Sequence, residues 1–407
     1  MFFHLGWRNI WRNPRRTAVI MTAIVIGVWS MIFLGALMRG MTDQMVRNGI
    51  STLTGHIQVH HKGYRNDPVI ENSMPDPRVV ESAIKKKLPS DVWWSSRVRV
   101  NAIVSNARHT AGITFVGINP SQEAKISFIG TAVTEGRYLK DNDTYGIIVG
   151  KALMDKFGTK LGRKMLVMSQ DTDKEIASRA FRIVGIFRAE MEATEKQFVF
   201  VTMQAAQRML KMKNRISEIS LVLPDPKDVD AMAASLRAVL PAVDYEVQTW
   251  RELLPFVTAY LNVYDGFIFI WFIVVFIAMG FGIVNTTLMA VFERIREFGL
   301  LKALGMKPWW IIKEVLTESF FLLVIGMFIG NTLSLLSVFA LSEVGIDLSA
   351  LAAGSEYFGI SRVIYPAVHL YDVIMANLVV FVLGLLVSVY PAVKAARFTP
   401  IEALTQT

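Results

Sequence analysis

Four long apolar stretches constrain the fold of this chain more than any other feature of its sequence. An α-helix needs about 20 predominantly apolar residues to cross the hydrocarbon core of a bilayer. Uncharged runs of at least that length occur at residues 17–38, 266–292, 319–342 and 373–393. Charged residues make up 19% of the chain, compared with about 25% in soluble domains. The sequence therefore predicts a membrane α-helical protein with four transmembrane helices, at residues 17–40, 264–292, 315–342 and 373–393.

The first apolar run has a second interpretation, as the core of a secretory signal peptide, because basic residues precede it. The core of a signal peptide is typically about 7–15 residues long. This run is longer, and Arg39 follows it directly. We therefore expect residues 17–40 to be retained as a membrane anchor.

Basic residues in the short segments beside the spans predict the orientation of the chain, because cytoplasmic flanks carry an excess of Lys and Arg. Four such residues precede the first span, five lie in 293–314 and two lie in the tail, residues 394–407. Residues 343–372 contain one, Arg362. Both termini and the 293–314 loop are predicted to face the cytoplasm of a bacterial cell, with residues 41–263 and 343–372 outside the inner membrane.

The segment at 41–263 is predicted to be a mixed α/β (α+β) extracytoplasmic domain, because β-branched alternating runs interleave with helical patterns. The predicted strands are residues 55–60, 98–104, 113–117, 146–149, 165–168, 181–187, 198–202 and 219–223. The predicted helices are residues 78–88, 151–157, 203–212, 228–240 and 249–264. The last helix leads directly into the second span, so one continuous helix could act as a lever.

Residues 1–16 are predicted to form an interfacial helix that Pro14 ends. Large apolar residues recur there at helical spacing, with arginines between them: Phe3, Trp7, Ile10 and Trp11, with Arg8 and Arg12. Tryptophan and arginine are typical of the boundary between headgroups and acyl chains. We expect Trp7, Arg8, Trp11 and Arg12 to anchor the chain at this interface.

The sequence offers no recognisable catalytic or cofactor-binding constellation. It has no Gly-x-x-x-x-Gly-Lys-[Ser/Thr] phosphate loop, so we do not expect the chain to hydrolyse ATP by itself. It has no cysteine, no His-Glu-x-x-His pair and no Gly-x-Ser-x-Gly elbow. His56, His60 and His61 are interpreted as polar strand residues, because no convincing third zinc ligand accompanies them.

Two features within the third apolar stretch have simple structural interpretations. Gly326 and Gly330 form a Gly-x-x-x-Gly pair, which is typical of closely packed membrane helices. Glu318 lies at the cytoplasmic edge of the span, and we expect its carboxylate to reach the membrane interface.

The most informative segment is the loop Glu293-Arg-Ile-Arg-Glu-Phe-Gly-Leu-Leu-Lys-Ala-Leu-Gly305. It predicts a short amphipathic helix with an apolar stripe formed by Ile295, Phe298, Leu301 and Leu304. Gly305 is a plausible helix terminator, and Pro308, Trp309 and Trp310 follow it at the membrane interface. The apolar stripe must be covered, and the spacing alone fits lipid headgroups as well as a groove on a partner protein.

This loop resembles the loop after the second span in permeases of the FtsX-like, MacB-like and lipoprotein-releasing (Lol-type) ABC family. The tail Pro391-Ala-Val-Lys-Ala-Ala-Arg-Phe-Thr-Pro-Ile-Glu-Ala-Leu404 and the N-terminal Trp7-Arg-Asn-Ile-Trp-Arg-Asn-Pro-Arg-Arg-Thr17 are similar to the same family. Pieces of the outer domain, such as Gly55-His-Ile-Gln-Val-His60 and Gln248-Thr-Trp-Arg-Glu-Leu253, look like the Lol-type subgroup.

The resemblance implies a mechanism. The loop helix would be a coupling helix seated on a separate ATP-hydrolysing subunit, present in two copies, which binds the ATP and Mg²⁺. The implied contact residues are Glu293, Arg294, Arg296, Glu297, Phe298, Gly299, Leu301, Lys302, Leu304 and Gly305. A second permease copy or a homologous permease would complete the membrane unit, and a periplasmic carrier or adaptor would receive the cargo. Membrane lipids are also expected partners, and nucleic acid is not.

For the Lol-type subgroup the resemblance implies release of lipoproteins or similar lipidated cargo from the outer leaflet. Spans one and two would line a groove for acyl chains, with candidate residues Val28, Ile32, Phe267, Ile270 and Val274. Two alternatives remain: a MacB-like efflux permease for drugs or peptides, and FtsX-like signalling to cell-wall hydrolases.

Overall fold

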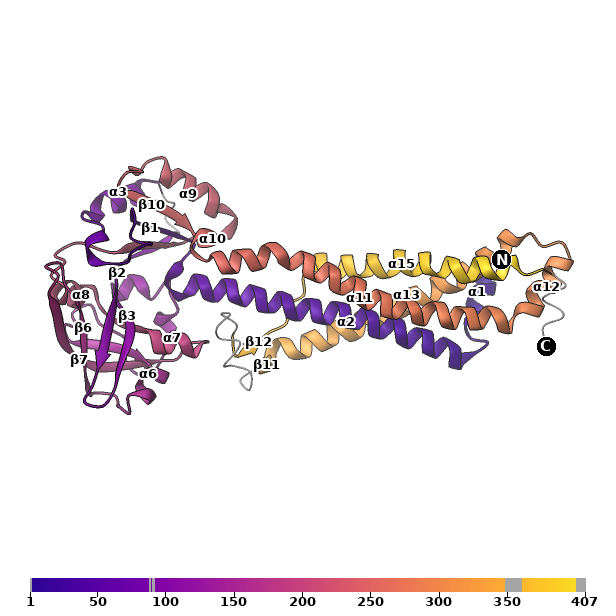
Figure 1. The fold of residues 1–407 in the computed structure, drawn as a ribbon, viewed down its shortest axis with the longest axis horizontal. Helices are drawn as coiled ribbons and strands as arrows, with labels where there is room; N and C mark the ends of the chain where they lie inside the picture. The colour runs from indigo at the N-terminus through magenta and orange to yellow at the C-terminus, as the bar shows by residue number, and fades with distance from the viewer. Residues whose placement is uncertain (1, 88, 90–91, 348–360, 400–407) are drawn as a thin grey trace. The chain divides into compact units, whose positions relative to one another are not determined.

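The computed structural model of the chain describes residues 2–87, 89, 92–347 and 361–399 (Figure 1). Residues 348–360 of the predicted outer loop and 400–407 of the predicted tail lie outside the described residues. The chain divides into two units. The helical unit comprises residues 1–42, 261–347 and 363–407, and the outer unit comprises residues 43–260 and 348–362.

The helical unit is built on four long helices that are apolar enough to cross a membrane. These are α2 (Pro14–Gly49), α11 (Pro255–Glu293), α13 (Pro308–Val344) and α15 (Leu370–Arg397). Two short helices, α1 (Phe2–Ile10) and α12 (Ile295–Ala303), lie at the same end of this unit as the C-terminal end of α15 (Figure 1). A short hairpin, β11 (Ile346–Asp347) with β12 (Val363–Ile364), follows α13.

The lengths of α2 and α11 exceed what a bilayer requires. They contain 36 and 39 residues, which corresponds to about 54 and 58 Å of helix at 1.5 Å per residue, whereas the hydrocarbon core is about 30 Å thick. Both helices contribute residues to the helical unit and to the outer unit.

The N-terminal helix ends earlier than the sequence predicted. α1 stops at Ile10, and Pro14 is the first residue of α2. The prediction that Pro14 terminates α1 is wrong, because proline is well tolerated in the first turn of a helix, where its missing N–H needs no partner.

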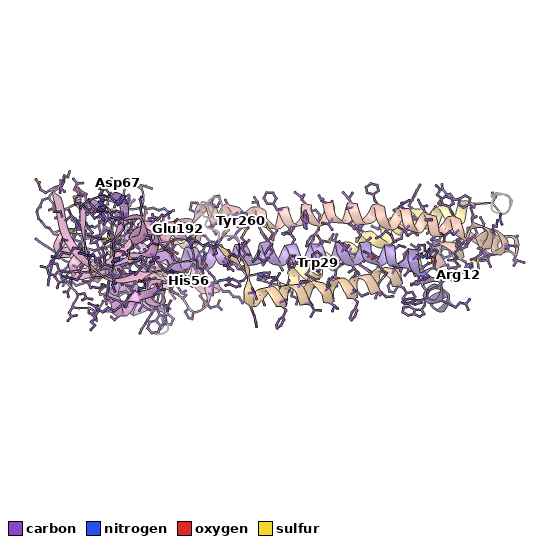
Figure 2. All side chains as sticks on the ribbon, turned by 90° about the horizontal axis from the view of Figure 1, so that it is seen from below. Arg12, Trp29, His56, Asp67, Glu192 and Tyr260 are labelled. Atoms are coloured by element: carbon purple, nitrogen blue, oxygen red, sulfur yellow. The ribbon has the colours of Figure 1, made fainter. Side chains whose placement is uncertain are left out.

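The glycine pair in α13 packs against α2 of the same chain. A Cβ added to Gly326 would lie 2.5 Å from Cγ2 of Ile24, and one added to Gly330 would lie 2.8 Å from Cβ of Val28. Only glycine allows so close an approach of two helices. Farther along the interface, Trp29 Nε1, which Figure 2 places midway along α2, donates a hydrogen bond of 3.1 Å to Ser337 Oγ.

The outer unit contains one mixed sheet, in the order β10-β1-β9-β2-β3-β8-β5-β7-β4, with β6 paired to both β2 and β7. Because β6 joins β7 back to β2, the strands β2, β3, β8, β5, β7 and β6 form a closed ring. The strands are β1 (Ile57–His61), β2 (Trp93–Ser105), β3 (Thr110–Ile118), β4 (Val133–Gly136), β5 (Gly146–Gly150), β6 (Lys164–Gln170), β7 (Ile176–Phe187), β8 (Phe198–Thr202), β9 (Glu218–Val222) and β10 (Tyr245–Thr249).

Short helices connect these strands, and large apolar side chains, including Phe115 and Phe181, form the core of the unit. The helices are α3 (Pro77–Lys87), α4 (Pro120–Glu123), α5 (Ile129–Ala132), α6 (Lys151–Lys156), α7 (Glu192–Gln197), α8 (Met203–Met209), α9 (Val229–Arg237) and α10 (Trp250–Leu253). The predicted mixed α/β domain between the first and second membrane helices is therefore confirmed.

The predicted continuous helix at 249–264 is interrupted. α10 ends at Leu253, and Leu254 leaves the helical region with φ −117° and ψ 65° before α11 begins at Pro255. A residue that precedes proline is sterically disfavoured in the α conformation, so the break at Leu254 follows from Pro255.

Candidate functional site

The predicted coupling segment forms a short helix, α12, between the long helices α11 and α13. Arg294 precedes this helix and Leu304 follows it. Gly305 then adopts φ +92°, a left-handed conformation that glycine takes at little cost. The chain can therefore turn at Gly305 and enter α13 at Pro308.

One face of α12 is buried within the helical unit. Ile295 and Phe298 are only 5% and 2% exposed, and the Arg294 guanidinium carbon lies 5.0 Å from the centre of the Phe298 ring. Phe298 belongs to an apolar cluster with Val291, Ile311, Val315, Ala392 and Ala395. This half of the predicted apolar stripe therefore holds α12 in place and is not available to a partner.

The opposite face of α12 presents apolar and basic side chains. Leu304 is 84% exposed and Leu300 is 54% exposed, and Arg296 is also exposed. Beside them is a surface hollow of about 710 Å³ lined by Leu301, Leu304, Gly305, Met306, Lys307, Trp309 and Trp310. Leu300 was missing from the predicted contact residues, although its position four residues before Leu304 places both on one helical face.

Lys302 points toward the end of α15 rather than outward. Its Nζ donates hydrogen bonds of 2.9 Å to the carbonyl oxygen of Ala396 and 2.6 Å to that of Phe398. The last carbonyls of a helix have no partner within the helix, so Lys302 satisfies such groups and ties α12 to α15.

An ionic network connects α12 to α13 and to the segment between α1 and α2. Arg294 forms ion pairs with Glu297 at 3.1 Å, Glu314 at 2.6 Å and Glu318 at 3.3 Å. Glu297 is also paired with Arg12, which Figure 2 shows at this end of the helical unit. The hydrogen bond from Arg12 is the main reason why the pKa of Glu297 lies below its usual value. Arg294 and Glu297, which were predicted to contact an ATPase, thus face other parts of their own chain.

Glu318 lies inside this network. Its residue is 8% exposed, and its Oε1 accepts a hydrogen bond of 2.6 Å from Arg16 Nη2. This carboxylate is buried among arginines of its own chain, because Arg16 and Arg294 compensate its charge within the bundle. That it lies at the level of the membrane interface stays a prediction. Arg16 also lies 3.7 Å from Glu293.

The four predicted interface anchors are exposed on or beside α1. Trp7 and Trp11 are 46% and 60% exposed, with ring centres 6.1 Å apart. Arg8 and the side chain of Arg12 are also exposed. Trp7 packs on Phe321 of α13 with ring centres 5.6 Å apart, so α1 is held against the bundle on one side.

The candidate cargo residues do not share one surface. Val28 and Ile32 are 0% and 4% exposed, because α2 is packed inside the bundle. Phe267, Ile270 and Val274 are 60%, 60% and 52% exposed on α11. The structure therefore leaves only the α11 residues accessible on a single chain.

In the outer unit, the segments that adjoin the long helices are joined through the sheet. β1 begins shortly after α2, β10 ends directly before α10, and the two strands pair antiparallel from Ile57–Thr249 to His61–Tyr245. The chain between α2 and β1 is anchored at Leu53, which has φ +69°. The Leu53 carbonyl accepts hydrogen bonds from Arg97 Nη1 and from Gln58 Nε2.

Arg97 is a buried ionic centre that the sequence did not reveal. Its side chain is 0% exposed and pairs with Glu123 at 2.8 Å and with Glu218 at 3.3 Å. Its partners Glu123 and Glu218 lie 26 and 121 residues away in the sequence. The local sequence around Arg97 therefore does not indicate that its side chain is buried.

Two of the three histidines, His56 and His60, have ordinary structural partners, whereas His61 Nδ1 is buried without a partner among the described residues. His56 Nδ1 accepts a hydrogen bond of 2.9 Å from the Leu223 N–H, and His60 Nε2 lies 3.2 Å from Gln248 Oε1. Within the described ranges, no group of three or more His, Cys, Asp or Glu side chains could hold a metal ion.

Two protein-family descriptions match the chain. Residues 17–239, more than half of its 407 residues, match the MacB-like periplasmic core domain, and residues 267–400 match the FtsX-like permease C-terminal region. The order of these matches agrees with the structure, in which the outer unit lies between the first and second long helices.

Several curated proteins are similar to the chain. An uncharacterized ABC transporter permease of Methanocaldococcus jannaschii is 25% identical over 68% of this chain and 66% of its own length. The lipoprotein-releasing system transmembrane protein LolC of Neisseria meningitidis is 23% identical over 95% of this chain and 93% of its own. The macrolide export ATP-binding/permease protein MacB of Marinobacter nauticus is 22% identical over 98% of this chain and 59% of its own. The chain therefore belongs to the FtsX-like and MacB-like family of ABC transporter permeases, and it is a multi-pass membrane protein.

Proposed function

We propose that this permease couples ATP hydrolysis by a separate ATPase subunit to the release of lipoproteins or similar lipidated cargo from the outer leaflet of the inner membrane. Two ATPase copies bind the ATP and Mg²⁺, and a second permease, identical or homologous, completes the membrane unit. Both termini and α12 face the cytoplasm, and a periplasmic carrier or adaptor receives the cargo.

The observation that carries this proposal is the division of α12 into two faces. Its inner face is held by Phe298, Lys302 and Arg294, which connect it to α13 and α15. Its outer face presents Leu300 and Leu304 next to the hollow at Trp309. A short apolar surface surrounded by basic residues suits a groove on a protein partner. Because the inner face fixes α12 to α13 and α15, a displacement of α12 would be transmitted to these long helices.

The pairing of β1 with β10 supports transmission to the outer unit. These strands adjoin the ends of α2 and α10, so a displacement of either segment would act on the same edge of the sheet. The anchoring of Leu53 by the buried Arg97 provides a stiff attachment for the segment after α2.

The test is the substitution Leu304→Asp, examined in the purified complex with its ATPase. Leu304 is exposed, so the variant should fold, but the buried charge would cost several kcal/mol if the site is covered by a partner. We expect loss of stimulated ATP hydrolysis. Val243→Asp, at a 79% exposed site of the outer unit, is the matched control and should behave like wild type. Full stimulation in both variants would refute the coupling role.

A MacB-like efflux function is the second candidate, favoured by the match of residues 17–239 to the MacB-like domain. The two functions differ in their cargo. A photoreactive lipid-modified peptide should label the exposed α11 residues Phe267, Ile270 and Val274 if the cargo is lipidated. Labelling of the outer unit by soluble drugs or peptides, without labelling of α11, would favour efflux.

A further inference from the structure

The outer unit contains a polar cavity that the coupling mechanism does not use. It has a volume of about 340 Å³, more than twenty times the roughly 10–15 Å³ that one water molecule needs. Its wall includes Gln58 of β1, Asn101 of β2, Thr114 of β3 and Glu218 of β9, together with Gln197 at the end of α7. The cavity is therefore lined mainly by hydrogen-bonding groups and is large enough for a small solute.

The ionic groups that line this cavity have a positive balance. Arg65 and Arg99 line it, and Glu218 is the one acidic residue among the lining residues. Glu218 is already compensated, because Arg97 Nη1 lies 3.3 Å from its Oε1. Arg65 donates hydrogen bonds to Gln248 and to the carbonyl of Leu253.

Arg99 is the cation with unused hydrogen-bond donors. Its Nη1 lies 3.7 Å from Glu218 Oε2, which is beyond hydrogen-bonding distance, and its guanidinium carbon lies 5.8 Å from the centre of the Phe198 ring. The guanidinium makes no hydrogen bond to any described residue, and the side chain is 34% exposed. A guanidinium presents five N–H donors that match the oxygens of a carboxylate or phosphate.

Thr114 places an accessible hydroxyl on the wall of the cavity. Its side chain belongs to a residue that is 6% exposed, and it lines the cavity. No hydrogen-bond partner for its hydroxyl exists among the residues that the structure describes. This hydroxyl is not among the buried side-chain atoms that lack a partner, so it is open to the cavity, and a solute there would provide a hydrogen-bond partner.

We propose that this cavity binds a small solute with a carboxylate or phosphate group, paired with Arg99 and hydrogen-bonded by the Thr114 hydroxyl. Thr54, which follows α2, and Leu253, which ends α10, also line the cavity. A bound solute would thus contact both segments that join the sheet to the long helices, and its binding would stabilise their arrangement.

The experiment measures binding of glutarate, inorganic phosphate and the neutral analogue glutaramide to the purified full-length protein by calorimetry, at constant ionic strength. We expect saturable binding of glutarate or phosphate and none of glutaramide. Which anion binds identifies the carboxylate or the phosphate as the ligand group.

Variants then locate the site. Arg99→Gln should weaken binding about tenfold or more, since a charged hydrogen bond contributes about 1.5–3 kcal/mol. Thr114→Val, which keeps the side-chain shape, should weaken it about fivefold. Arg108→Gln, an exposed site in the same unit, makes the same charge change and should bind like wild type. If Arg99→Gln does not fold, Thr114→Val carries the test.

Absence of saturable binding of both anions up to about 10 mM, a concentration that corresponds to a weak free energy of binding of about −3 kcal/mol, would overturn the proposal. Equal affinities of wild type, Arg99→Gln and Thr114→Val would also overturn it, because the anion would then bind elsewhere.

Discussion

At the scale of single residues, Arg97 joins several buried groups of the outer unit. Its guanidinium holds Glu123, Glu218 and the carbonyl of Leu53. Each of these groups is buried. Without Arg97, Glu123 would have no ion pair among the described residues, whereas Glu218 would keep Arg99 at 3.7 Å and the Leu53 carbonyl would keep Gln58.

Replacing Arg97 with Met should therefore destabilise the outer unit strongly. Removal of one partner from a buried ion pair typically costs about 3–5 kcal/mol, because the remaining charge stays buried without a partner. Hydrogen exchange of the full-length protein should show a matching loss of protection in β2 and in residues 50–54. Unchanged protection would show that Arg97 is not structurally required, and Arg108→Gln serves as the control.

His56 should make the stability of the outer unit depend on pH. Burial lowers the pKa of His56 below its ordinary value of 6.5, so the folded unit binds the proton less readily than the unfolded chain. Stability from this residue should be complete above pH 6.5 and should decrease as the pH falls from 6.5 toward the lower folded-state pKa.

The comparison with His56→Gln isolates this contribution. The free energy of unfolding of wild type, minus that of the variant, should shrink as the pH falls from about 7.5 to about 5, the range in which histidine titrates. A difference that stays constant over this range would contradict the assignment.

At the scale of elements, α12 combines a structural face with an exposed face. Phe298→Ala should destabilise the helical unit by about 3–5 kcal/mol, as expected for a large aromatic side chain removed from a packed core. Leu300→Ala, at a 54% exposed position, should change stability by less than about 0.5 kcal/mol. Thermal inactivation in detergent measures the stability of both variants. Equal destabilisation by Phe298→Ala and Leu300→Ala would contradict the assignment of Phe298 to the buried face and Leu300 to the exposed face of α12.

The elements also show how far the sequence could predict this fold. The four long helices and all six strands of the ring followed from hydropathy and alternation, because burial dominates in those segments. The edge strand β10 was missed, although Tyr245, Val247 and Thr249 alternate with polar residues in it, because the helix prediction began at residue 249. β2 begins five residues before its predicted start, because its buried residues there include Ser95, Ser96 and Arg97.

The candidate site was predictable only in part. The spacing of apolar residues located α12. The same spacing does not distinguish Ile295 and Phe298, which pack inside the chain, from Leu304, which is exposed. The ionic partners of Arg294 lie up to 24 residues away in α13, and no local pattern connects them. The cavity beside Arg99 likewise arises from strands that are distant in sequence.

At the scale of the whole molecule, the proposed coupling mechanism requires α12 and the outer unit to face opposite sides of the membrane, and it requires α12 to touch an ATPase. The chain contains no cysteine, so single cysteines can report on both requirements. Leu304 and Val243 are suitable positions, because they are 84% and 79% exposed.

The most direct measurement is thiol-specific crosslinking of Leu304→Cys and Val243→Cys variants in intact membranes that also contain the ATPase subunit. We expect Leu304→Cys to crosslink to the ATPase and to be protected from membrane-impermeant reagents added outside, whereas Val243→Cys should react with those reagents and form no ATPase crosslink. Labelling of Leu304→Cys from outside, or an ATPase crosslink from Val243→Cys alone, would contradict the coupling of α12 to ATP hydrolysis.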